Sequence, residues 1–179
     1  MGKLGLESGT VRLAAYDSAW PELYEAEAAR LQPFLAAQNV ALLLEHSGST
    51  SVPGLCAKPI IDILAGRKAD EERPRIIAAI TAAGYVYRGE QGIPGRDFFR
   101  LGDPRQYHLH LTAIGSAFWH DHRTFRDFLR AHPDAADQYA AVKQELALRF
   151  PFDRESYING KTEFVESVLT RARQSTVTP

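Results

Sequence analysis

The sequence is poor in several features that mark particular classes of protein. Cysteine occurs once, at Cys56, so no disulfide can form within the chain and a reducing compartment is indicated. No apolar run of about 18 residues or more occurs, and the first residues lack the charged-then-apolar plan of a signal peptide. We therefore expect a soluble, cytoplasmic chain with no part in a membrane.

The sequence also lacks an excess of charge of either sign. The chain has 21 Lys and Arg residues against 22 Asp and Glu residues, a formal net charge of −1. Such a balance offers no large basic footprint and argues against nucleic acid as a partner. No repeat or low-complexity linker interrupts the 179 residues, and a hydrophobic content of 45% suffices for a core. We expect a single domain over 1–179.

Hydrophobic periodicity and turn residues predict an α/β (α+β) fold. Strands are expected at 40–45, 58–65, 85–88, 97–101 and 107–114. Helices are expected from a cap at Ser18 to residue 35, at 70–83, 117–130 and 133–150, and from Asp153 onward. This order predicts a mixed β-sheet flanked by helices, with a helical C-terminal third.

The segment from Glu45 to Gly66 holds the most informative chemistry. An apolar run ends in a Gly-Ser-Thr-Ser turn at Gly48–Ser51, and the next apolar run contains a single carboxylate, Asp62. A carboxylate in such a run must be hydrogen-bonded, paired or bound to a metal. A turn of small residues exposes backbone N–H groups that suit a phosphate. The segment therefore predicts a phosphate and metal site at the ends of two neighbouring strands.

This segment, with HSGSTSVPGL and AKPIIDI, resembles the GrpB family. The resemblance continues through GYVYRGEQGIPGRDFF (84–99), YHLHL (107–111), FRDFLRAHPDAADQYAAVKQELA (125–147) and YINGKTEFV (157–165), and so covers nearly the whole chain in order. It implies a fold similar to the DNA polymerase beta-like nucleotidyltransferase superfamily, in which a Gly-Ser turn precedes an acidic strand. Similarity to this superfamily also implies nucleotide binding and metal-dependent nucleotidyl transfer.

Asp62 is the candidate catalytic and metal-binding carboxylate. The superfamily pattern places a second acid two positions further along the same strand, where this chain has Leu64. Two-metal phosphoryl chemistry needs several carboxylates. Candidates for a replacement acid are Glu45, Glu90 and Asp97, although each could equally be a solvated charge or an ion-pair partner. Asp62 could also serve only to satisfy the N–H groups of the Gly48 turn.

Three histidines are candidate metal ligands beside Asp62. His108 and His110 are two residues apart on a predicted strand and so share a face, and His46 ends the strand before the Gly-Ser turn. With Asp62 they could bind Mg²⁺ or Mn²⁺, or, given the imidazoles, a transition metal such as Zn²⁺ or Fe. They could also be polar groups of a half-exposed strand or hydrogen-bond donors to phosphate.

The candidate ligand-binding residues are the four residues of the Gly-Ser-Thr-Ser turn and two basic side chains. They are Gly48, Ser49, Thr50, Ser51, Lys58 and Arg96. Lys58 precedes the Asp62 strand, and Arg suits bidentate binding of phosphate. Arg88, Arg100 and Lys161 are further basic candidates.

The preferred interpretation is a nucleotidyltransferase-like protein that binds a nucleotide or another phosphorylated small molecule. Its enzymatic form is metal-dependent nucleotidyl transfer, with phosphate held at Gly48–Ser49 and developing charge stabilised by Lys58 or Arg96. Three alternatives stay open: a non-catalytic binding module, favoured by Leu64; a protein-interaction domain; and a His/Asp transition-metal protein such as a hydrolase. Substrate and oligomeric state are left undetermined by the sequence.

Overall fold

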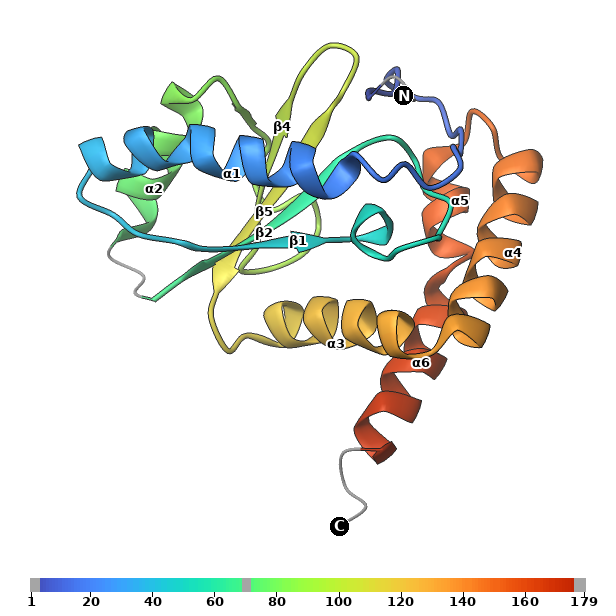
Figure 1. Ribbon diagram of the computed structural model, residues 1–179. Coiled ribbons are helices and arrows are strands. Elements are labelled where there is room, and N and C mark those ends of the chain that lie inside the picture. Colours follow the sequence, from blue (N-terminus) through green and yellow to red (C-terminus); the bar gives the residue numbers. More distant parts are fainter. Residues whose placement is uncertain (1–3, 69–71, 176–179) are drawn as a thin grey trace.

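The computed structural model describes residues 4–68 and 72–175 and shows a mixed α/β fold built on a five-stranded sheet (Figure 1). The strands are β1 (Leu43–Ser47), β2 (Ile61–Arg67), β3 (Val86–Tyr87), β4 (Asp97–Leu101) and β5 (Tyr107–Ala113), in the order β1-β2-β5-β4-β3. β2 and β5 pair in parallel, and the other pairs are antiparallel. No helix of the described residues is both long and apolar enough to cross a membrane.

Helices cover both faces of the sheet. α1 (Trp20–Ala37) and α2 (Arg73–Ala82) pack on the face that presents Ile61, Ile63 and Leu109. α3 (Ala117–Ala131) lies against the other face, and α4 (Pro133–Arg149), α5 (Arg154–Asn159) and α6 (Thr162–Ser175) gather at one end of the molecule (Figure 1). A second hydrophobic cluster joins α3, α4 and α6 through residues such as Leu129, Tyr139 and Val168.

The predicted elements are present, with differences at their ends. Ser18 does not cap α1; Asp17 accepts a hydrogen bond from the Ala19 N–H instead. The last predicted helix is two helices, α5 and α6, divided at Gly160. A Cβ at Gly160 would lie 2.4 Å from Leu146 Cδ2 of α4, so close packing accounts for this glycine. The first two residues of the helix predicted at 70–83 fall outside the described residues.

Alternation of side chains along β2 divides its residues between the two faces. Ile61, Ile63 and Ala65 enter the core under α1 and α2. Asp62 and Gly66 therefore face the α3 side, where a Cβ on Gly66 would lie 2.6 Å from Ile114 Cγ1 and 2.8 Å from a ring carbon of Trp119. Gly66 thus allows the close approach of α3 to the sheet, and this helix forms one wall of the cavity described below.

Gly66→Ala is expected to lower the free energy of unfolding by about 1–3 kcal/mol, because the added methyl group overpacks the contact with Trp119. Urea denaturation monitored by tryptophan fluorescence measures the change. Lys68→Ala, one residue past β2 and exposed, serves as the control and should change stability by no more than about 0.5 kcal/mol. An unchanged midpoint for Gly66→Ala would contradict this account of how α3 docks.

Candidate functional site

Two neighbouring strands bring one carboxylate and two imidazoles together. In the parallel pairing of β2 with β5, Asp62 lies opposite His108 and Leu64 lies opposite His110. Asp62 Oδ1 is 3.2 Å from His108 Nδ1 and 3.5 Å from His110 Nε2. The potential ligand atoms of these three residues all lie within 4.8 Å of one another. The sequence prediction that Asp62, His108 and His110 share a site is therefore consistent with their positions.

These separations fit a single metal ion. Two ligand atoms bound at about 2.1 Å to a tetrahedral ion lie about 3.4 Å apart, close to the two measured distances. The Asp62 side chain is 29% exposed, so the cluster is open to the cavity beside it. One carboxylate with two imidazoles is a ligand set for Zn²⁺, Mn²⁺ or Fe²⁺, whereas Mg²⁺ prefers oxygen ligands.

The electrostatics of the cluster favour the protonation states that bind a metal. Burial opposes ionisation of Asp62, but hydrogen bonds from His108 and His110 and their electrostatic attraction hold its pKa well below the usual value. Burial lowers the pKa of His108 to about 4, against the opposing effect of Asp62. At neutral pH the cluster therefore pairs an ionised carboxylate with a neutral His108, and Nδ1 of this ring can bind a metal when the ring proton is on Nε2.

The Gly48 turn packs directly against Asp62. Gly48 has a φ of 67° and leads into η1 (Ser49–Ser51), a single turn of 3-10 helix. A Cβ on Gly48 would lie 2.4 Å from Asp62 Oδ2, so only glycine allows this approach. The hydroxyl groups of the turn have internal partners: Ser51 donates to the Gly48 oxygen, Thr50 bonds His46, and Ser49 bonds Tyr139.

A cavity of about 570 Å³ opens beside the cluster of Asp62, His108 and His110. Its walls come from the Gly48 turn, β2, β5, the loop before β4, and helices α3 to α6. This volume lies in the range of small-molecule sites, roughly 300–1,000 Å³. The candidate residues that line it are Gly48, Ser49, Thr50, Lys58, Asp62, Arg96, His108, His110 and Lys161. Ser51 faces a second cavity instead.

Cations dominate the end of this cavity formed by α5 and the α5–α6 junction. Burial, together with the charge of Lys161, lowers the pKa of Lys58 to about 7. Burial also lowers the pKa of Lys161 to about 8. Nε of Arg154 is buried without a hydrogen-bond partner. Among residues 4–68 and 72–175, no carboxylate lies within ion-pair distance of these three side chains.

Arg96 lines the cavity but is partly committed to the loop that carries it. Its guanidinium donates to the backbone oxygens of Glu90 and Gln91 and lies over the rings of Phe98 and Phe118. Nε of Arg96 is buried and has no partner. Arg96 therefore braces the loop through Nη2, and its Nε has no hydrogen-bond partner in the described part of the chain.

His46 lies apart from the other two histidines. Its ring stacks on Tyr24 of α1, and its Nε2 is 3.0 Å from Thr50 Oγ1. His46 pairs with Ile63, whose side chain points away from the Asp62 face. The expectation that His46 joins the metal ligands is therefore not supported, because alternation along β1 turns its ring to the α1 side and into the second cavity.

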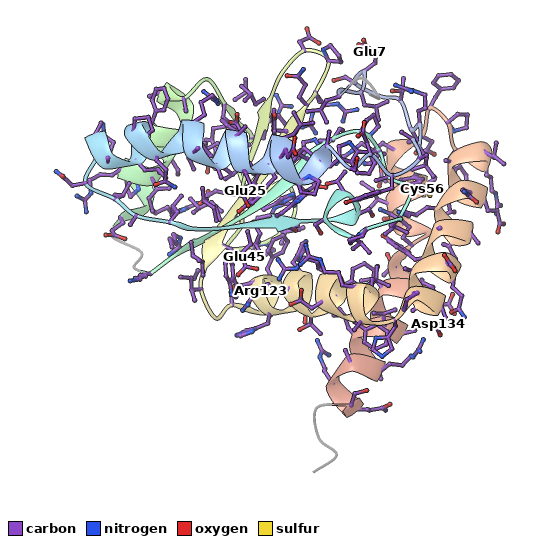
Figure 2. All side chains as sticks on the ribbon, viewed as in Figure 1. Glu7, Glu25, Glu45, Cys56, Arg123 and Asp134 are labelled. Atoms are coloured by element: carbon purple, nitrogen blue, oxygen red, sulfur yellow. The ribbon has the colours of Figure 1, made fainter. Side chains whose placement is uncertain are left out.

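The three acids considered as a second metal carboxylate all have other partners. Glu45 does face the α3 side, where it pairs with Arg123 and Arg126 at 3.0 Å and 2.7 Å, and Figure 2 shows Glu45 and Arg123 close together between β1 and α3. Asp97 accepts two hydrogen bonds from Arg73 and one from Tyr87 on the opposite face. Glu90 accepts from the Gly95 N–H within its own loop.

Some cavity residues are not evident from sequence. His122 of α3 lines the cavity, its Nδ1 is 2.9 Å from the Phe118 oxygen, and its ring centroid is 6.0 Å from that of His110. The spacing of Phe118, His122, Phe125 and Leu129 along one helical stripe could have revealed it. Arg154 carries no comparable signal, because it reaches the cavity through the placement of α5.

Comparison with known proteins gives consistent matches. The model of the family described as GrpB protein matches residues 10–171. The UPF0157 protein YqkA of Bacillus subtilis is 36% identical over 92% of this chain and 48% of its own length, so the chain spans about half of that relative. A UPF0157 protein of Pseudomonas aeruginosa is 41% identical over 91% of this chain and 68% of its own length.

A solved structure agrees with the fold. The crystal structure of the conserved protein GrpB from Enterococcus faecalis superposes with a TM-score of 0.82 at 33% identity, covering 93% of this chain and 100% of that one. Sequence and structure thus match along nearly the same stretch, and the chain belongs to the GrpB family.

Proposed function

We propose that this protein binds a nucleotide or another phosphorylated small molecule in the cavity, together with a divalent metal ion held by Asp62, His108 and His110. The observation that carries the proposal is the charge of the cavity wall. Lys58, Lys161 and Arg154 line the same cavity as the Asp62 cluster. Among the described residues, no carboxylate lies within ion-pair distance of these three cations. An anion bound beside such half-buried cations would balance their charge.

The remaining walls suit an organic group attached to the phosphate. Phe125, Leu129, Tyr139, Tyr157 and Leu169 contribute aromatic and aliphatic surface from four helices. Binding sites for small molecules commonly combine such surface with a few placed polar groups. A nucleotide has both parts, an apolar base and a charged phosphate chain.

The placement of the Gly48 turn and Asp62 on adjacent strands supports a relationship to the nucleotidyltransferase superfamily. In that superfamily the metal ions neutralise the phosphate chain during transfer of the nucleotidyl group. In this chain the position of the second acid holds Leu64, which is fully buried, and Glu45, Glu90 and Asp97 have partners elsewhere. These contacts favour binding assisted by one metal over two-metal transfer.

Nucleotide binding predicts a rise in melting temperature. Because a ligand at one hundred times its Kd stabilises a protein by about 2.7 kcal/mol, ATP with Mn²⁺ should raise the midpoint by roughly 5 °C or more. Differential scanning fluorimetry measures the shift. Ser49→Asp, which adds a negative charge to the cavity wall, should abolish it, and Ser167→Asp on the exposed face of α6 should leave it intact. No shift across nucleotides and metals at millimolar concentration would argue against the proposal.

A metal ion at the cluster predicts stoichiometric binding. Protein prepared without chelator should carry Zn, Mn or Fe, and the apoprotein should bind Mn²⁺ or Zn²⁺ in calorimetry. Asp62→Asn and His108→Ala should each weaken binding by more than about tenfold while the fold persists, because each removes a ligand. His120→Ala, exposed on α3, is the matched control. A folded protein that takes up no metal would leave Asp62 as a structural carboxylate.

Pyrophosphate release separates a binding module from an enzyme. With one carboxylate at the cluster, we expect slow release or none from each nucleoside triphosphate, tested with a panel of acceptors that includes the protein itself. Any release should be lost in Asp62→Asn. Fast turnover that survives this substitution would show that the chemistry does not depend on Asp62.

A further inference from the structure

Two lysines that are distant in sequence meet over one aromatic ring. Lys58 precedes β2, and Lys161 lies between α5 and α6. Their ammonium nitrogens are 5.5 Å and 4.7 Å from the centroid of the Tyr157 ring. Tyr157 is 1% exposed, and the charge of Lys161 acts on Lys58, so the two ammonium groups lie close together beside this buried ring.

The groups around this pair are mostly cationic. Arg154 of α5 lowers the pKa of both lysines, and Arg105 from the β4–β5 turn lowers that of Lys58, although its guanidinium donates to the oxygens of Leu6 and Glu7. The acidic group that acts on both is Asp62 of β2, which already accepts hydrogen bonds from two histidines. Positive charge at this end of the cavity therefore exceeds negative charge.

The Gly48 turn is a poorer anion site than the sequence indicates. Its three hydroxyl groups are engaged within the protein. The Asp62 carboxylate presses against Gly48, and a negative charge there repels a phosphate. Without a metal ion at Asp62, a phosphate held by the turn alone would thus meet a carboxylate at close range.

We infer that Lys58, Lys161 and Arg154 form the subsite for a doubly charged phosphoryl group, and that the Gly48 turn supports Asp62 instead of cradling phosphate. This inference rests on the proposed function and deepens it. It assigns the terminal phosphate of the ligand to the α5–α6 junction, in the same cavity as the metal cluster. Two ammonium groups and one guanidinium match the charge and the several oxygen acceptors of a phosphate or sulfate dianion.

Calorimetric titration with sodium sulfate and with ATP tests the subsite, with adenosine as the uncharged comparison. Lys58→Met and Lys161→Met, which keep an unbranched side chain but remove its charge, should each weaken sulfate and ATP binding about tenfold or more. Lys68→Met is the matched control, because Lys68 is exposed and outside the cavity. Lys58→Arg should retain most of the affinity. Adenosine should bind the wild type and both variants alike.

Proton uptake gives a second measure that needs no variant. The pKa values of Lys58 and Lys161 are about 7 and about 8, so a bound dianion should protonate them. Sulfate stays doubly charged from pH 6 to 8. Its binding should take up between one and two protons at pH 8, roughly 0.9 at Lys58 and 0.5 at Lys161, and close to none at pH 6. Titrations in buffers of different ionisation enthalpy report this number.

The outcomes separate this inference from the proposed function. If ATP binds but neither lysine variant weakens it and no proton is taken up, the subsite is wrong and the proposed function stands. If sulfate binding is lost in Ser49→Asp but not in the lysine variants, the anion belongs to the Gly48 turn. If neither ATP nor sulfate binds the wild type, both proposals fail.

Discussion

The parallel register of β2 with β5 is the constraint on which the site depends. It places Asp62 opposite His108, and alternation adds His110 on the same face. A slip of one residue would put Leu109 beside Asp62 and turn both imidazoles into the core under α1 and α2. Burial of apolar side chains on the other face of the sheet fixes this register, because Ile61, Ile63 and Leu109 are completely buried there. The hydrophobic core therefore sets the geometry of the polar cluster.

The helical C-terminal third supplies the other half of the site. α3 docks against the sheet where Gly66 leaves room for Trp119. The cluster formed by α3, α4 and α6 then fixes the junction that carries Lys161, and the contact of Gly160 with Leu146 brings this junction close to α4. The sheet contributes Asp62, and the helical third contributes Arg154 and Lys161, so neither part forms the cavity alone.

Sequence reasoning recovers the elements and the centre of the site because both follow local rules. Apolar runs and turn residues locate the strands, and a period of two places His108 and His110 together. The same rule, applied to β1, shows only that Glu45 and His46 face opposite sides of the sheet. Which of the two faces Asp62 is decided by the register of β1 with β2, which pairs Ser47 with Asp62 and His46 with Ile63.

What escapes sequence reasoning depends on tertiary contacts. The last helix is divided at Gly160, where the chain passes close to Leu146 of α4. The sequence around Gly160 does not predict this contact. Glu45 and Asp97 carry the charge expected of metal ligands, and only the packing shows that arginines of α3 and α2 pair with them. Arg154 enters the cavity because α5 turns back over it, so its role has no local signal.

In the proposed subsite, Lys58 and Lys161, beside the Tyr157 ring, serve ligand binding at the expense of the stability of the fold. A half-buried cation without a counterion lowers the stability of the unliganded fold, and an apolar side chain of similar size would often raise it. Selection for a robust scaffold alone would therefore remove Lys58 and Lys161, and their presence indicates selection for something other than folding. A stabilised version of this protein, obtained by consensus or computational design, would tend to lose its charged wall first. Its melting temperature would then be a misleading guide to whether the cavity still works.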